Sequence, residues 1–223
     1  MHHRGDHEQG APELLSPLQR LTSYSVAAGR IPYAAAVFTP IRARRLTLRP
    51  VTMADLEDVY AYQRRPDVCR WMLGSEPRSR EQSQKSVAAM TGEDGLRVEG
   101  DVLSLAAEAN GRVTGTVELV WRSRADQTAE IGYVFNPEFS GQGLATEAVG
   151  ALLGWGFEEF GLHRVYGRCH AGNEASARLM TRLGMRCEAR HVESYLFRGE
   201  WADRFVFAML AREWLSRSAA LAG

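Results

Sequence analysis

Two glycines placed two residues apart, Gly141 and Gly143, have the clearest chemical meaning in this sequence. They lie in the run Val134 to Glu147, where a strand-like segment passes directly into apolar residues at helical spacing. Because glycine has no Cβ atom, the backbone can turn tightly and direct successive N–H groups outward at the positive end of the following helix. The run predicts a cradle for a phosphate or pyrophosphate, although an ordinary strand-to-helix turn also fits a lone G-x-G.

A second segment, Asn173 to Met185, is typical of a short helix with defined ends. Asn173 can cap its N-terminus, and Gly184 can end it. With Ser140-Gly141-Gln142-Gly143-Leu144-Ala145, this helix resembles the GCN5-related N-acetyltransferases (GNAT). The acetyl-CoA loop of that family reads roughly Q/R-x-x-G-x-G/A and is followed by an N-x-x-S helix that ends in L-G-F or L-G-M.

Within this superfamily the sequence is most similar to the RimJ/RimL-like branch, the ribosomal-protein-alanine acetyltransferases. Three segments carry this likeness, namely Leu46–Pro50, Gly141–Ala148 and Gly199–Asp203. The resemblance spans residues 44 to 214. It departs from the family pattern at Ser140, where Gln, Arg or an aromatic residue is usual, and this change could weaken one phosphate contact.

The resemblance implies an α/β fold with a mixed, mostly antiparallel twisted sheet flanked by helices. In this fold the strand before the loop and the strand after the long helix splay apart and admit the pantetheine arm of acetyl-CoA. Amides of the arm can then satisfy backbone groups that the splayed strands leave unpaired. The residues expected to bind the cofactor are Phe135, Asn136, Ser140, Gly141, Gln142, Gly143, Leu144, Ala145, Thr146 and Asn173.

Acetyl transfer from a thioester to an amine needs a neutral amine, a stabilised oxyanion and a proton for the leaving thiolate. The resemblance places Glu130 where related enzymes carry an acid that accepts the amine proton, with Glu118 as the second candidate. It places Ser176 near the sulfur of CoA as the proton donor. Glu130 also fits an exposed carboxylate paired with an arginine, and Ser176 fits an ordinary residue of a first helical turn. Glu147, in the first turn after the loop, is interpreted as structural.

Patterning along the chain predicts the elements that position these residues. Strands are expected near 46–48, 102–109, 113–121, 130–135, 164–169, 188–197 and 204–210, and helices from Thr52 to about Tyr62, over 79–90, from 145 to Gly161 and after Asn173. The Asn110-Gly111 pair predicts a hairpin turn. Residues 1–43 are interpreted as an extension, partly disordered or packing as an arm, 44–215 as the acetyltransferase domain and 216–223 as a tail.

Composition limits the classes of protein that this chain can be. Lys plus Arg and Asp plus Glu both number 27, so no overall charge favours nucleic acid or an anionic membrane. No apolar run of about eighteen residues predicts a membrane span, and the polar N-terminus lacks a secretory signal. Three scattered cysteines and six histidines without a cluster predict no metal site and favour the cytoplasm.

These observations predict an N-acetyltransferase that moves an acetyl group from acetyl-CoA to a primary amine by direct attack. The acceptor is either a protein N-terminus or a small amine. The alternative is a GNAT-fold acyl-CoA-binding or regulatory module without turnover. An apolar N-terminal fragment and an exposed sheet edge make a homodimer plausible.

Overall fold

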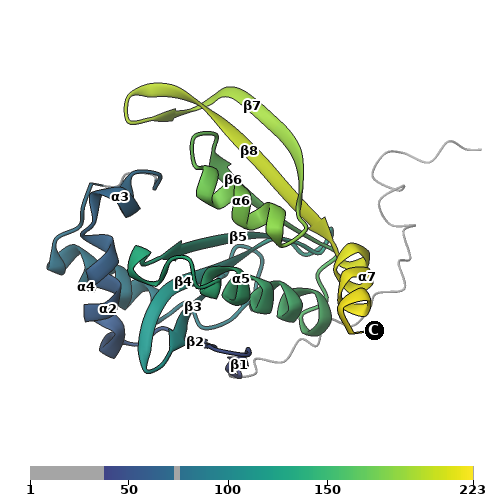
Figure 1. Cartoon of the computed structure of the whole chain (residues 1–223), viewed down its shortest axis with the longest axis horizontal. Coiled ribbons are helices and arrows are strands. Elements are labelled where there is room, and N and C mark those ends of the chain that lie inside the picture. The colour runs from purple at the N-terminus through teal and green to yellow at the C-terminus, as the bar shows by residue number, and fades with distance from the viewer. Residues whose placement is uncertain (1–37, 73–75, 223) are drawn as a thin grey trace, which may run out of the picture. The chain divides into compact units, whose positions relative to one another are not determined.

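The computed structural model describes residues 38–72 and 76–222. Most of the predicted N-terminal extension, residues 1–37, lies outside the described residues. The described part forms one sheet with helices on both faces (Figure 1). This mixed α/β architecture confirms the fold class that the resemblance implied.

In the described part of the chain, eight strands pair in the order β1-β2-β3-β4-β5-β6-β8-β7. All neighbouring strands are antiparallel except β5 and β6, which are parallel. The strands are β1 (Ile41–Arg42), β2 (Thr47–Pro50), β3 (Val102–Ala109), β4 (Arg112–Ser123), β5 (Thr128–Phe135), β6 (Arg164–His170), β7 (Arg186–Phe197) and β8 (Glu200–Leu210).

The helices connect these strands and cover the sheet. The long α5 continues into a π-helical turn, η3, in which the Phe160 amide bonds the carbonyl of Trp155. The helical elements are η1 (Met53–Asp55), α2 (Leu56–Gln63), α3 (Pro66–Cys69), α4 (Arg80–Met90), η2 (Pro137–Phe139), α5 (Leu144–Gly154), η3 (Trp155–Glu159), α6 (Glu174–Arg182) and α7 (Ala211–Ala222).

Alternation along the strands separates two cores, one on each face of the sheet. Leu105, Val117 and Ile131 belong to the larger core, which includes the apolar sides of α5 and α6. Ala106 and Val113 belong to a smaller core with residues of α2 and α4. The same alternation sends Glu118, Glu130 and Gly132 toward the face of α2 and α4 and sends Tyr133 to the face of α5 and α6.

β5 and β6 pair over only part of their length. Their ladder joins Thr128–Ile131 to Arg164–Gly167, although β5 continues to Phe135 and β6 to His170. Gly167 stands at the last rung, where an added Cβ would lie 2.8 Å from the Met180 sulfur. The chain therefore has the splayed pair of central strands that the resemblance implied, with glycine at the apex.

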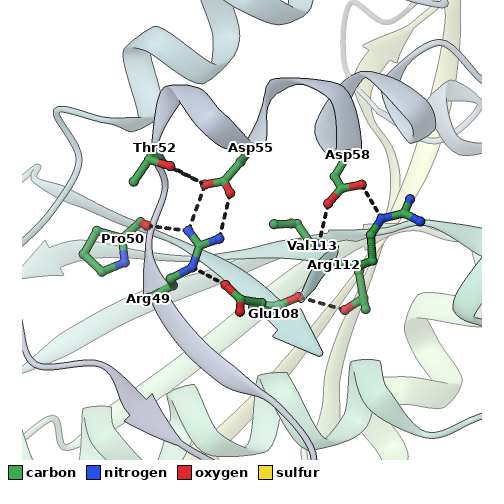
Figure 2. Close-up of polar contacts among 10 residues, drawn as sticks. Arg49, Pro50, Thr52, Asp55, Asp58, Glu108, Arg112 and Val113 are labelled. Carbon is green, nitrogen blue, oxygen red and sulfur yellow. Dashed lines mark hydrogen bonds and ion pairs between the residues drawn. The ribbon is translucent and has the colours of Figure 1, made fainter. Parts of the chain in front are cut away.

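An arginine clamp holds the first helices against the sheet (Figure 2). Arg49 of β2 donates from Nη1 and Nη2 to the two carboxylate oxygens of Asp55, at 2.9 and 2.7 Å, and from Nε to Glu108 of β3. Burial would raise the pKa of Asp55, but the bonds from Arg49 and Thr52 outweigh it and hold the pKa below its usual value. The Leu46–Pro50 motif thus contains a residue that fixes where α2 begins.

Most of the predicted elements are present with ends shifted by a few residues. The last hairpin is longer than predicted, because β7 begins at Arg186 and β8 at Glu200. Its turn residues Arg198 and Gly199 both have positive φ, which lets the strands pair up to the turn. The proposed domain boundary at residue 44 falls between β1 and β2, and the proposed tail from residue 216 continues α7.

Candidate functional site

A cleft of about 990 Å³ opens where β5 and β6 diverge. It runs from the loop between β5 and α5 to the face of the sheet that carries α2 and α4. Of the site residues predicted from sequence, those that line it are Glu130, Phe135, Asn136, Ser140, Gly141, Gly143, Leu144, Ala145, Thr146, Asn173 and Ser176. The splayed strands therefore gather nearly all of the predicted residues around one cavity.

The loop at one end of the cleft has the backbone geometry that its glycines predicted. Gly141 and Gly143 have φ angles of 77° and 75°, in the left-handed region that disfavours other residues. The amides of Leu144, Ala145 and Thr146, in the first turn of α5, donate no hydrogen bond within the described residues. Free N–H groups at the positive end of a helix of eleven residues can donate hydrogen bonds to an anionic phosphate group.

Gln142 faces away from this cleft. Within the described residues it lines a separate surface hollow beside Arg45, whose Nη1 donates to the Gln142 carbonyl at 2.7 Å. The same arginine donates from its backbone N and from Nε to Glu147, at 2.6 and 2.7 Å. Arg45 and Glu147 thus brace the loop from behind, which agrees with a structural role for Glu147.

Ser176, the predicted proton donor, lies near the middle of the cleft at the start of α6. The Asn173 side chain accepts the Ser176 amide at 3.1 Å, so Asn173 caps α6 as expected. The Ser176 Oγ lies 2.7 Å from the hydroxyl of Tyr133, a residue that the sequence analysis did not single out. Burial raises the pKa of Tyr133 to about 12. Two protonated hydroxyls therefore form a hydrogen-bonded pair inside the cleft.

Glu130 lines the cleft but already has three partners. Arg168 bonds its carboxylate from Nε and Nη2 at 2.7 and 2.9 Å, and Arg122 lies 2.7 Å away. The Tyr166 hydroxyl donates to it at 3.3 Å. This is the paired arrangement that the sequence analysis left open, and the two guanidinium groups offset the charge of the carboxylate.

Glu118, the second candidate, has a different environment. It lies on β4 opposite Gly132, and an added Cβ on Gly132 would stand 3.5 Å from the Glu118 carboxylate. No hydrogen bond or ion pair reaches that carboxylate from the described residues. Burial first, and then the charge of Glu93, raise the pKa of Glu118. Gly132 itself lines the cleft, so the missing side chain leaves space between Glu118 and the cavity.

The far end of the cleft is walled by aromatic rings that come from three regions. The ring centre of Trp71, which follows α3, lies 4.7 Å from the ring centre of His170 at the end of β6. Phe197 of β7 lies 4.9 Å from His170, and Tyr195 lies 5.9 Å from Phe197. An added Cβ on Gly172 would be 2.8 Å from Trp71, so glycine permits this contact across the cleft.

His170 has a defined orientation in this wall. Its Nδ1 accepts the Gly172 amide at 2.9 Å, so the neutral ring carries its proton on Nε2. Burial lowers the pKa of His170, which favours the neutral ring near pH 7. His170, Tyr195 and Phe197 were not predicted as site residues, because no spacing in the sequence signals which ends of β6, β7 and α3 meet.

The described residues form neither a metal-binding cluster nor a membrane-spanning helix. Their His, Cys, Asp and Glu side chains make no group of three that could hold a metal ion. None of the helices in the described ranges is long and apolar enough to cross a membrane.

Comparison with known proteins agrees with this geometry. The family described as an acetyltransferase (GNAT) domain matches residues 45–186. YnaD of Bacillus subtilis, named as an uncharacterized N-acetyltransferase, is 40% identical over 89 residues, which are 40% of this chain and 52% of YnaD. YdaF of Bacillus subtilis, named as a putative ribosomal N-acetyltransferase, is 32% identical over 47% of this chain and 57% of its own length. Spermidine N(1)-acetyltransferase of Escherichia coli is 26% identical over 49% of this chain and 59% of its own length.

The chain thus spans between half and three fifths of these three relatives. Among solved structures, a GNAT-family acetyltransferase from Bacillus anthracis has a TM-score of 0.70 and 29% sequence identity. That likeness covers 78% of this chain and all of the other. The fold therefore matches over most of the chain.

Proposed function

Because the chain belongs to the GNAT acetyltransferase family, we propose that it transfers an acetyl group from acetyl-CoA to a primary amine. The observation that carries this proposal is the cleft that brings together a loop with free amides and a pair of hydroxyls, with the desolvated carboxylate of Glu118 beside Gly132 of its lining. Acetyl-CoA supplies an activated thioester. The amine attacks that thioester directly, so no covalent enzyme intermediate is needed.

In this proposal the loop holds the cofactor. The free amides of Leu144, Ala145 and Thr146 and the positive end of α5 bind the pyrophosphate. The unpaired edge of β5 near Phe135 and the side chain of Asn173 hold the pantetheine arm. Ser140 borders the same end of the cleft and supplies a hydroxyl where the family usually has a longer side chain.

We assign the role of general base to Glu118 ahead of Glu130. A base must hold a free lone pair and works best with a pKa near the operating pH. Glu118 has no partner among the described residues and a raised pKa, whereas Glu130 is bonded to Arg122 and Arg168. Glu118 takes the amine proton through the space beside Gly132, directly or by way of one water. Glu130 stays the alternative base.

Ser176 and Tyr133 provide the proton for the leaving thiolate. Ser176 lines the cleft, and its hydroxyl is hydrogen-bonded to that of Tyr133, which can replace the proton that Ser176 gives up. The raised pKa of Tyr133 keeps that hydroxyl protonated throughout the physiological range. Ser176 is therefore the donor, and Tyr133 acts through it.

The acceptor is a protein N-terminus or a small amine. The likeness to YdaF favours the ribosomal, RimJ/RimL-like branch, and the likeness to the spermidine enzyme favours a small amine. We propose the cytoplasm as the location, since the three cysteines, which all lie in the described residues, form no disulfide with one another.

A homodimer through the β7–β8 hairpin is the proposed assembly. β7 is an edge strand, and the exposed apolar side chains of this hairpin are Val192, Leu196 and Trp201. Sedimentation equilibrium of the protein and of Trp201→Lys tests this assembly: a dimer that the variant weakens supports it, and a monomer at all concentrations contradicts it.

Isothermal titration with acetyl-CoA and CoA, followed by a panel of peptides and small amines with detection of free CoA, tests the function. Binding together with acetylation of an amine supports it. Binding without transfer to any amine favours the acyl-CoA-binding module instead. Absence of binding to both ligands contradicts the proposal and the module alike.

A further inference from the structure

The acceptor end of the cleft carries an excess of positive charge. Its lining includes the carboxylates Asp67 and Glu130. Asp67 is paired with Arg65 at 2.9 Å, and Glu130 is paired with two arginines. Neither carboxylate is therefore left to balance a further cation.

Arg204 of β8 is a cation in this wall that no described carboxylate pairs with. It is half-buried, lines the cleft, and forms no ion pair with a described acidic residue. Its guanidinium lies 3.9 Å from the centre of the Tyr195 ring, which orients the group and shields one side of it from water. In the sheet Arg204 pairs with His170, so both residues stand at the same depth of the cleft.

The aromatic rings of this wall are arranged unlike a site for a cationic ligand. Such a site offers free ring faces to the ligand cation. Here Arg70 lies 4.7 Å from the centre of the Trp71 ring, and Arg204 covers Tyr195. A polyamine would compete with these guanidinium groups for the rings and would meet their repulsion.

From these contacts we infer that the acceptor is an amine bearing a carboxylate, and that Arg204 binds this carboxylate. The inference rests on the proposed acetyl transfer and narrows its substrate class. A half-buried guanidinium forms charge-assisted and often bidentate bonds with a carboxylate, and such bonds are stronger than bonds between neutral groups. The carboxylate can be that of a free amino acid or that of an acidic residue next to a peptide N-terminus. Arg204 is thus a specificity residue, since it contacts the acceptor away from the reacting amine.

Two matched pairs of acceptors distinguish a free amino acid from a peptide with an acidic residue next to its N-terminus. Alanine is compared with alaninamide, and a peptide that begins Ala-Asp with the same peptide beginning Ala-Asn, with spermidine as the cationic acceptor. We expect the acidic member of at least one pair to have a kcat/KM about tenfold or more above its neutral partner, and spermidine to be the poorest acceptor.

Arg204→Gln should reduce this preference to about twofold or less, and Arg204→Lys should keep part of it because the positive charge stays. The KM for acetyl-CoA should be unchanged in both variants, which shows that they fold. Equal kcat/KM for acidic, neutral and cationic acceptors in the wild-type protein would overturn the inference while leaving acetyl transfer intact. If no amine in the panel is acetylated, the proposed function fails, and the inference fails with it.

Discussion

The two ends of the cleft are built from different parts of the chain. The proposed cofactor end is mainly backbone, with free amides and two glycines from one continuous segment of the chain. The acceptor end is made of side chains from α3, β6, β7 and β8, which are brought together only by the fold. In the proposed function, a ligand at the first end is held by groups that every residue possesses, and a ligand at the second end is held by groups that a single substitution removes.

This difference separates two kinds of sensitivity. The cofactor end depends on backbone conformation and on open space, so a bulky residue harms it more than the loss of a side chain. The acceptor end depends on the charge and shape of individual residues, so changes such as Arg204→Gln alter selectivity without altering the loop. The pair Ser176 and Tyr133, between the two ends, joins side chains of α6 and β5.

The largest effect is expected from Gly143→Trp. An added Cβ on Gly143 would lie 3.4 Å from Nη2 of Arg45, so the indole would displace the arginine that braces the loop, and a φ of 75° disfavours any L-residue with a side chain. We expect the Kd for acetyl-CoA to rise by more than about 100-fold, measured by isothermal titration, because the loop would lose its phosphate contacts. Gly111→Trp is the matched control, since Gly111 has a φ of 72° and open space around it in a hairpin turn. Equal loss of binding in both variants would contradict a local role for the loop.

Glu118→Gln should come next, because it removes the proposed base and keeps its shape. We expect kcat to fall by about 10² to 10⁴ with little change in the KM for acetyl-CoA. Since only the ionised carboxylate accepts a proton, wild-type kcat/KM should fall as the pH drops through the raised pKa of Glu118, and the variant should lose this limb. Glu130→Gln is the comparison: a larger loss there than in Glu118→Gln would transfer the role of base to Glu130.

Ser176→Ala and Tyr133→Phe test the centre of the cleft. If the two hydroxyls act in sequence, each single variant should lower kcat about tenfold or more, and the double variant should lose less than the product of the two effects. Rates of free-CoA release at saturating acetyl-CoA provide the measurement. Fully multiplicative effects would show that the two groups act independently.

The smallest effect is expected outside the cleft, at Glu188. Bonds from Arg164 and Arg186 lower its pKa to about 2. A lowered pKa in the folded state stabilises the protein above the ordinary carboxyl pKa, and this contribution disappears as the pH falls from about 4.5 toward 2. Glu188→Gln should therefore lower the free energy of unfolding by about 0.2–1 kcal/mol near neutral pH, as expected for a solvent-accessible pair. Urea titrations of the wild-type protein and the variant, near neutral pH and near pH 2, measure the difference in the free energy of unfolding. The kcat of the variant should stay unchanged.

The sequence predicted the cofactor end far better than the acceptor end for a physical reason. Gly141, Gly143 and Asn173 have backbone conformations and caps that few residue types provide, so their types and spacing reveal the local structure around them. Arg204 and His170 are ordinary residue types in strands, and only the splay of β5 and β6 gives them a common cavity. The environment of Glu130 was equally hard to predict from the sequence, since the arginines that pair with it come from two other strands.

The four-residue ladder between β5 and β6 also bears on the order in which this chain folds. The hairpins β3–β4 and β7–β8 join segments that are adjacent in sequence, whereas Thr128 pairs with Arg164, separated by all of α5 and η3. Closing that long loop for only four rungs is entropically costly, so we expect the two hairpin-rich halves of the sheet to form early and to join late. The cleft exists only once the two halves of the sheet have joined. Weakening the β5–β6 ladder should therefore abolish ligand binding while most of the secondary structure persists.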